Sequence, residues 1–315
     1  MSEKSLKMLA GVVAGLLVLY LITALASGSP DASAADGGAL AAALEKAGAG
    51  EPRSIRILSR QDTVELRRDG ARWTVAGYPA DSARVARFLE ALRDARIGHL
   101  ASSNAANHAR LGVTDSAARV LEITGEDGES VRLLVGDAGP SYDGTFMRLP
   151  GRDEAYLVYG AIRTHVTRDV DDWRDRTIIA VDTAAIRTLE LTREGATYAL
   201  TRGDDGWTLD GAAADEDAVA DVLRELVRLE ATGFVADTTE EARDRKRFGA
   251  LVALDADGDT LAALSLAERN ASYLIATVPG DSTRFELPRW RADRILPTAD
   301  ALRADDADDG GGDRR

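Results

Sequence analysis

Apolar positions recur along this chain with the same spacing in two places. One series follows Trp73, and the other follows Trp207, which lies 134 residues later. The first series is Val85, Phe88, Leu89, Leu92 and Leu100, and the second is Val219, Val222, Leu223, Leu226 and Phe234. Each member of the second series lies 134 residues after its counterpart. We therefore predict that the chain contains two copies of one folded module.

Each copy is expected to contain one amphipathic helix. The apolar positions from Val85 to Leu92 fall on one face at the spacing of an α-helix. Asp81 precedes them as a helix N-cap, and Asp215 stands at the same place in the second copy. The apolar faces, and the tryptophan that opens each series, are predicted to lie in the two cores.

Short strands separated by tight turns fill the rest of each copy. Asp-Gly pairs, which favour hairpin turns, end at Gly70 and Gly128 in the first copy and at Gly206 and Gly258 in the second. Helices do not alternate with strands, which argues against parallel winding. We predict an α+β fold class: two tandem repeats of a mostly antiparallel sheet with one main helix each, preceded by an N-terminal transmembrane helix.

The transmembrane helix is expected over residues 9–26. This run of apolar and small residues is interrupted only by Tyr20 and Thr23, and it just reaches the length of about 18 residues that crosses a bilayer. Lys4 and Lys7 precede the run and acidic residues follow it, which places the N-terminus in the cytoplasm and the body outside.

A cleaved signal peptide is the alternative, because Ala24-Leu25-Ala26 has the small residues of a cleavage site. The apolar run is longer than the usual hydrophobic region of about 7–15 residues in a signal peptide, which favours a retained anchor. The folded body is exported in either case. With the anchor retained, the chain is a single-pass protein of the inner membrane with an extracytoplasmic, periplasmic body.

The chain then divides into six segments. These are a cytoplasmic N-terminus (1–8), the transmembrane anchor (9–26), a linker (27–52) with room for a short helix at Ala39–Lys46, a first module (53–183), a second module (184–300) and an acidic tail (301–315). The tail is rich in Asp and Gly, so we expect it to be disordered and solvated, with an acidic docking segment as the alternative.

Composition excludes several classes of function. The net charge of −14 argues against nucleic acid as a partner and against an electrostatic hold on anionic lipids. The chain contains no cysteine, which removes disulfides, thiol nucleophiles, thiolate metal sites and a lipidated cysteine. The length of 315 residues suits roughly two domains.

No sequence motif in the chain identifies a catalysed reaction. The three histidines, His99, His108 and His165, lack the spacing of a metalloprotease site, and neither a nucleophile elbow nor a nucleotide-binding glycine loop is present. His108 could act as a base on a polar loop, but a solvent-exposed residue is the favoured interpretation. Asp255, Asp257 and Asp259 suggest a calcium loop, yet a hairpin turn fits their spacing better. We assign no catalytic, cofactor-binding or metal-binding residue and expect no cofactor.

The run Trp173, Arg174, Asp175 and Arg176 is the candidate site that we single out. Tryptophan and arginine are enriched at interface hot spots, so the run could contact a partner. The favoured alternative is a buried tryptophan with a local Arg–Asp pair, because the similar run from Trp290 to Ile295 ends the second copy. Both tryptophans are then expected to pack back onto the module just completed.

Three further features of the chain occur together: the anchor followed by two modules, the motif Leu111-Gly112-Val113 with the run from Phe146 to Gly151, and the junction from Trp173 to Arg176. On these features the chain resembles a bacterial family described as a domain of unknown function, family 4340. Some members look like envelope partners of ABC-type export or gliding-motility transporters. The resemblance therefore implies an accessory role at a membrane complex, and it brings no catalytic residues.

Three hypotheses of function remain. The first is a non-enzymatic, membrane-anchored accessory protein of an ABC-type transporter complex. The second is a periplasmic module that binds a small ligand between the two repeats. The third is a hydrolase in which His108 and a nearby carboxylate meet in a pocket.

Overall fold

The computed structural model describes residues 37–236 and 245–304. The predicted anchor at residues 9–26 lies outside them, as does most of the predicted tail. Within the described part, no helix combines the length and the apolar character needed to span a membrane.

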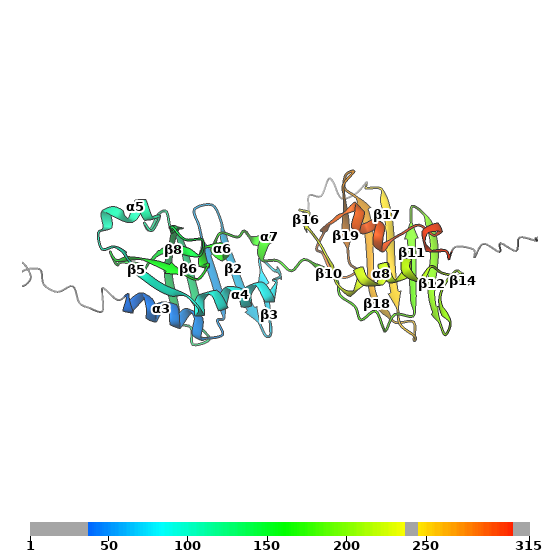
Figure 1. The fold of residues 1–315 in the computed structure, drawn as a ribbon, viewed down its shortest axis with the longest axis horizontal. Coiled ribbons are helices and arrows are strands. Elements are labelled where there is room, and N and C mark those ends of the chain that lie inside the picture. The colour runs from blue at the N-terminus through cyan, green and yellow to red at the C-terminus, as the bar shows by residue number, and fades with distance from the viewer. Residues whose placement is uncertain (1–36, 237–244, 305–315) are drawn as a thin grey trace, which may run out of the picture. The chain divides into compact units, whose positions relative to one another are not determined.

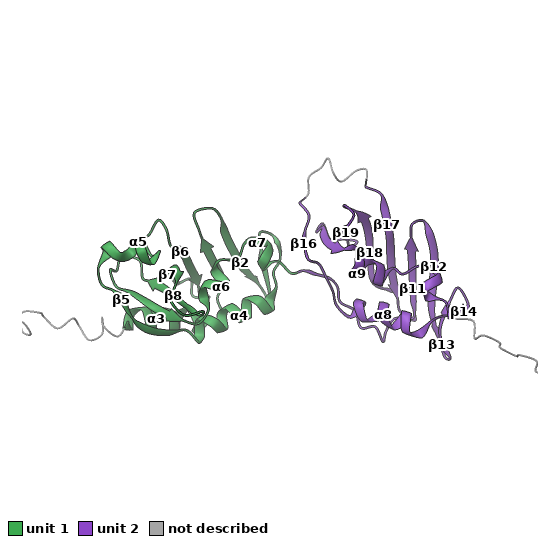
Figure 2. Cartoon of the chain, turned by 45° about the horizontal axis from the view of Figure 1, so that its top comes forward, with its two compact units in different colours: residues 1–175 green, residues 176–315 purple. Residues whose placement is uncertain are grey.

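The chain forms two compact units that divide between Asp175 and Arg176 (Figure 2). The predicted boundary after residue 183 therefore lies eight residues too late, because residues 177–179 already form a strand of unit 2. The predicted tail also begins too early, since Leu302 is fully buried in the core of unit 2.

Unit 1 is a nine-stranded antiparallel sheet in the order β4-β3-β2-β1-β6-β7-β8-β9-β5 (Figure 1). Its strands are β1 (Ser54–Leu58), β2 (Thr63–Asp69), β3 (Arg72–Val75), β4 (Tyr78–Pro79), β5 (Arg96–Ser102), β6 (Arg119–Thr124), β7 (Ser130–Ala138), β8 (Gly144–Arg148) and β9 (Ala155–Tyr159). Its helices are α3 (Gly38–Ala49), α4 (Ser82–Arg93), α5 (His108–Leu111), α6 (Ile162–Val166) and α7 (Val170–Trp173), with a 3₁₀ turn, η1, at Ala105–Asn107.

Unit 2 contains a second nine-stranded sheet with the equivalent order, β14-β13-β12-β11-β17-β18-β19-β20-β16. Its strands are β11 (Thr188–Arg193), β12 (Ala196–Gly203), β13 (Gly206–Leu209), β14 (Ala212–Ala213), β16 (Gly233–Phe234), β17 (Arg247–Leu254), β18 (Thr260–Glu268), β19 (Tyr273–Thr277) and β20 (Phe285–Pro288). A separate pair is formed by β10 (Thr177–Ile179) and β15 (Leu229–Glu230), and the helical segments are α8 (Glu216–Val227), α9 (Arg289–Ile295) and η2 (Asp300–Leu302). The matching strand orders support the predicted duplication, and the α+β class is confirmed.

The main helix of each unit has the predicted cap and the predicted buried face. The Asp81 carboxylate accepts a hydrogen bond of 2.9 Å from the backbone N–H of Arg84, and Asp215 accepts one of 2.8 Å from Ala218. These bonds satisfy backbone donors that the first helical turn leaves open. On the apolar stripes, Val85, Phe88 and Leu92 of α4 and Val219, Val222 and Leu226 of α8 are almost completely buried. Trp73 and Trp207 are 8% and 6% exposed, as predicted.

Part of the predicted linker is instead a core element of unit 1. Residues 38–49 form α3, which packs beside α4, and Leu40, Leu44 and Ala47 are buried in the same cluster as the α4 stripe. The segment contains many small residues and only two leucines, so its composition looked like that of a spacer. The two leucines are four residues apart and share a face, which is enough to attach a helix to a larger core.

The two faces of the sheet of unit 1 are covered differently. Met147, Tyr156 and Val158 face the main cluster with α3 and α4, whereas Phe146 and Ala155 belong to a separate small cluster with Leu111 of α5 and Val113. Successive side chains of a strand point to opposite faces, so α5 covers the face away from α4. Figure 1 shows α5 on the other side of the sheet from α3 and α4.

Candidate functional site

The run Trp173 to Arg176, predicted as a possible interface, closes the end of unit 1. Trp173 is fully buried, and its ring lies 5.7 Å from Phe88 and 6.4 Å from His165, centroid to centroid. A side chain with no exposed surface is not available to a partner. The structural alternative that we favoured for this tryptophan therefore agrees with its position.

Arg174 is also largely enclosed, at 9% exposure. Its guanidinium group lies 3.1 Å from the Asp171 carboxylate and 3.7 Å from the centroid of the Tyr78 ring. The backbone N–H of Asp175 donates to the carbonyl oxygen of Pro79 at 2.9 Å. Arg176 belongs to unit 2, where its carbonyl oxygen accepts from Ala231 at 2.8 Å. Trp173 and Arg174 therefore lie in the interior of unit 1.

The predicted counterpart, Trp290, does not pack onto its module. It lies in α9 and is 58% exposed, although Ile295 at the end of the same helix is fully buried. The position equivalent to Trp173 is instead occupied by Leu302. The backbone N–H of Asp81 donates to the carbonyl oxygen of Trp173, and the backbone N–H of Asp215 donates to the carbonyl oxygen of Leu302. The two Trp-Arg runs look alike in sequence but occupy different places in the repeat.

The exposed Trp290 lies on a firmly anchored helix. Arg294, one turn further along α9, places its guanidinium group 5.1 Å from the centroid of the Trp290 ring. Glu225 of α8 pairs with Arg291 at 2.7 Å and with Arg294 at 3.3 Å. The buried Ala292 holds the opposite side of α9 in the core. We call Trp290 and Arg294 the α9 surface; an indole displayed on a rigid helix beside an arginine is typical of an interface hot spot.

His108 is buried, in contrast to our expectation of an exposed loop residue. It is 6% exposed in α5, and its Nε2 atom lies 2.8 Å from the carbonyl oxygen of Asp153. That contact with the backbone between β8 and β9 holds α5 against the sheet. Among the described residues, no carboxylate makes a hydrogen bond with His108, so the predicted histidine–carboxylate pair is not assembled there.

His165 lies against the apolar core of unit 1. Its ring stacks on Phe88 with centroids 5.1 Å apart, and its Nδ1 atom is buried without a hydrogen-bond partner in the described part of the chain. Burial, together with the positive charges of Arg168, Arg87 and Arg84, lowers the pKa of His165 from 6.5 to about 4. The imidazole is therefore neutral at physiological pH.

The acidic turns are hairpin turns, as predicted. In the β17–β18 turn, the Asp255 carboxylate accepts from the backbone N–H groups of Asp257 and Asp259, at 3.0 and 2.9 Å. Asp127 in the β6–β7 turn accepts from Glu129 at 2.9 Å in the same way. Within residues 37–236 and 245–304, no group of three His, Cys, Asp or Glu side chains is placed to hold a metal ion.

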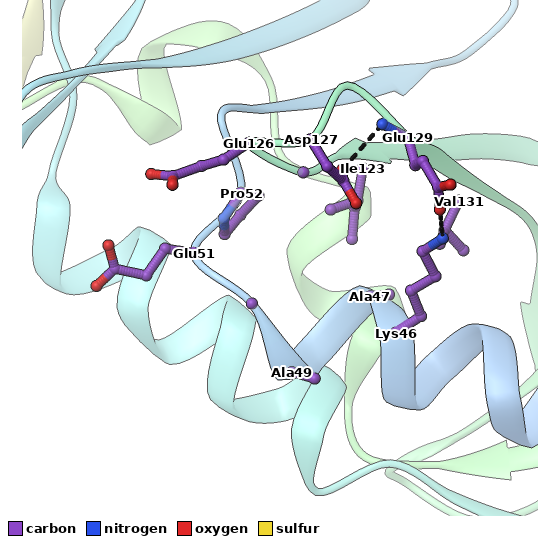
Figure 3. A pocket seen from close by; sticks show the side chains of 12 residues that line it. Lys46, Ala47, Ala49, Glu51, Pro52, Ile123, Glu126, Asp127, Glu129 and Val131 are labelled. Atoms are coloured by element: carbon purple, nitrogen blue, oxygen red, sulfur yellow. Dashed lines mark hydrogen bonds and ion pairs between the residues drawn. The ribbon is translucent and has the colours of Figure 1, made fainter.

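Unit 1 also contains an open cavity of about 550 Å³ that sequence analysis did not predict (Figure 3). It lies between the end of α3 and the β6–β7 turn, and its charged lining is Lys46, Glu51, Glu126, Asp127 and Glu129. The ammonium group of Lys46 donates to Glu129 across the cavity, and this hydrogen bond raises the pKa of Lys46. Residues 38–49 were expected to be part of a linker, so no sequence pattern indicated that Lys46 lies beside the β6–β7 turn.

Comparison with known families adds one finding. The family model described as "Domain of unknown function (DUF4340)" matches residues 73–247, more than half of the chain. The chain belongs to the DUF4340 family. The match runs from β3 of unit 1 to the start of β17 of unit 2, so it includes both main helices. Searches of curated proteins and of solved structures found no match to this DUF4340 chain.

Proposed function

We propose that this DUF4340 chain is a membrane-anchored, extracytoplasmic interaction protein of the bacterial envelope. It has no enzymatic activity of its own and serves as an accessory component of an ABC-type transporter complex. The anchor at residues 9–26 holds the two units on the far side of the inner membrane, where they bind the transporter.

The exposure of Trp290 is the observation that carries this proposal. A tryptophan that is 58% exposed leaves a large apolar surface in water, whereas the other three tryptophans are buried. Arg294 lies against the indole, and Glu225 fixes the helix that carries both. A partner that covers the α9 surface would remove the indole from water without reorganising unit 2.

Co-purification of the full chain from detergent-solubilised membranes tests the proposal. We expect permease and ATPase subunits of an ABC transporter to be retained, and Trp290→Ala to reduce them by at least about tenfold, as is typical of a hot-spot tryptophan. Tyr142→Ala is the matched control, because Tyr142 is an aromatic residue of unit 1 that is 99% exposed. Absence of transporter subunits would refute the role, and equal retention by Trp290→Ala would refute the α9 surface.

A further inference from the structure

One long sheet edge in unit 1 is left open. β5 is the last strand of its sheet, and it spans seven residues, whereas the other terminal strands, β4, β14 and β16, span two residues each. β5 pairs with β9 on its inner side, and no strand of the described residues pairs with its outer side. Arg96, His99 and Leu100 of β5 are exposed. Such an edge presents unpaired backbone groups to any extended segment that approaches it.

Unit 2 covers the equivalent stretch with a strand of its own. β10 runs antiparallel to β15, and the backbone N–H of Ala231 donates to the carbonyl oxygen of Arg176. The next backbone N–H, that of Thr232, donates to the carbonyl oxygen of Glu286, which lies in β20. Consecutive N–H groups of a strand point in opposite directions, so β10 lies on the outer side of this stretch and β20 on its inner side.

The register shows which part of β5 corresponds to the covered stretch. Gly233 and Phe234 pair with Glu286 and Phe285 in unit 2, and His99 and Leu100 pair with Leu157 and Tyr156 in unit 1. With the offset of 134 residues, Glu230 and Ala231 correspond to Arg96 and Ile97. The start of β5 is therefore the position that β10 covers in unit 2. In unit 1 the chain before β1 forms α3, which packs on α4.

Charge indicates the kind of segment that the open edge accepts. Arg96, the first residue of β5, is exposed and forms no ion pair with another described residue. In unit 2 the residue equivalent to Arg96 is Glu230, which pairs with Arg228 at 2.6 Å. Two copies of β5 placed edge to edge would bring like charges together, which disfavours self-association. An acidic strand would pair with the open backbone groups of β5 and with the charge of Arg96.

The irregular register of β5 limits the length of that segment. The pairing of β5 with β9 shifts between Ile97 and His99 and again between Leu100 and Ser102. Bulges of this kind twist an edge and stop long ladders from growing along it. The edge therefore suits a short segment of a few residues, as β10 is in unit 2.

We propose that the outer edge of β5 binds a short, extended, acidic segment of a partner protein, added antiparallel in the way that β10 is added to β15. The backbone of β5 supplies the hydrogen bonds, and Arg96 supplies the preference for acidic side chains. This edge lies in unit 1 and is a different surface from the α9 surface of unit 2.

A synthetic peptide tests the edge directly. The probe is a fluorescein-labelled peptide of sequence Asp-Thr-Ile-Thr-Val-Asp, with fluorescence anisotropy and amide hydrogen exchange of the full chain as readouts. We expect saturable binding that slows exchange in β5. The same peptide N-methylated at alternate residues should bind at least about tenfold more weakly, because it has lost the donors of a strand pair.

Variants separate charge from backbone pairing. Arg96→Glu should weaken binding about tenfold at low salt and less at high salt, and the exposed Arg72→Glu should leave it unchanged. Trp290→Ala should also leave it unchanged, so failure of the transporter role and failure of the edge are distinguishable. Equal binding of the N-methylated peptide, or unchanged exchange in β5, would overturn the proposal. It would also be overturned if β5 amides are protected without the peptide and lose that protection when residues 1–36 are removed.

Discussion

The backbone N–H of Asp81 donates a 2.9 Å hydrogen bond to the carbonyl oxygen of Trp173, which joins the start of the main helix to the end of unit 1. The same bond, at 2.9 Å, joins Asp215 to Leu302 in unit 2. Each bond is accompanied by an isolated β-bridge, Ala80 with Arg174 and Ala214 with Arg303. Both units therefore close in the same way, with different side chains at the equivalent place.

Replacing Trp173 tests this closure. Trp173→Ala should lower the free energy of unfolding of unit 1 by about 3–5 kcal/mol, because it leaves a large cavity beside Phe88. Trp173→Leu, which introduces the side chain that unit 2 uses, should cost clearly less. The Trp173 indole N–H has no hydrogen-bond partner in the described part of the chain, so leucine sacrifices no such bond. Urea unfolding measures both values, and equal losses would contradict the equivalence with Leu302.

The place of α3 in the core predicts a second set of stabilities. Leu44→Ala should destabilise unit 1 by about 2–4 kcal/mol, because Leu44 is 3% exposed within the main cluster. Glu45→Ala, a change at the exposed neighbouring position, should be almost neutral. Thermal unfolding of the full chain would show the difference. A neutral Leu44→Ala would mean that residues 38–49 act only as a linker.

The low pKa of His165 predicts that acid destabilises unit 1. The pKa is about 4 in the folded chain and 6.5 in the absence of shifts, so the unfolded chain takes up the proton first as the pH falls. This contribution to stability is present above pH 6.5, is lost progressively down to about pH 4, and changes no further below that. His165→Phe keeps an aromatic ring against Phe88 and cannot be protonated.

Urea unfolding tests that prediction. Midpoints should be measured at about pH 7, where the effect is absent, and at about pH 5.5 and 4.5, where it grows. The difference between His165→Phe and the unmodified chain should grow as the pH falls, in favour of the variant. His99→Phe, at an exposed position of β5, is the control and should follow the unmodified chain. A constant difference across the three pH values would show that His165 is not responsible.

The absence of native cysteine allows a direct test of membrane topology. Tyr142→Cys places a thiol at a position that is 99% exposed on unit 1. If the body is extracytoplasmic, a membrane-impermeant maleimide should label this thiol in intact spheroplasts as fully as in lysed cells. Ser2→Cys, before the proposed anchor, should be labelled only after lysis. Labelling of Tyr142→Cys only after lysis would place the body in the cytoplasm.

Sequence patterns predicted the parts of the fold that depend on local spacing. The caps at Asp81 and Asp215, the buried helix faces and the α+β class follow from periodicity and turn residues. Trp290 was assigned wrongly because a Trp-Arg motif carries no information about which helix of the repeat it occupies. His108 was assigned wrongly because its burial depends on the carbonyl group of Asp153, which is 45 residues away in sequence. The cavity beside Lys46 and the open edge of β5 arise from long-range packing, which local patterns do not encode.

The α9 surface is tested most directly by a photo-crosslinking residue, p-benzoylphenylalanine, at position 290 of the full chain in living cells. The account predicts that this position forms a crosslink to a subunit of an ABC-type transporter, and that the same residue at position 142 forms little or none. If position 290 forms no crosslink to a transporter subunit, or position 142 forms the same one equally well, the α9 surface is not the site of partner binding.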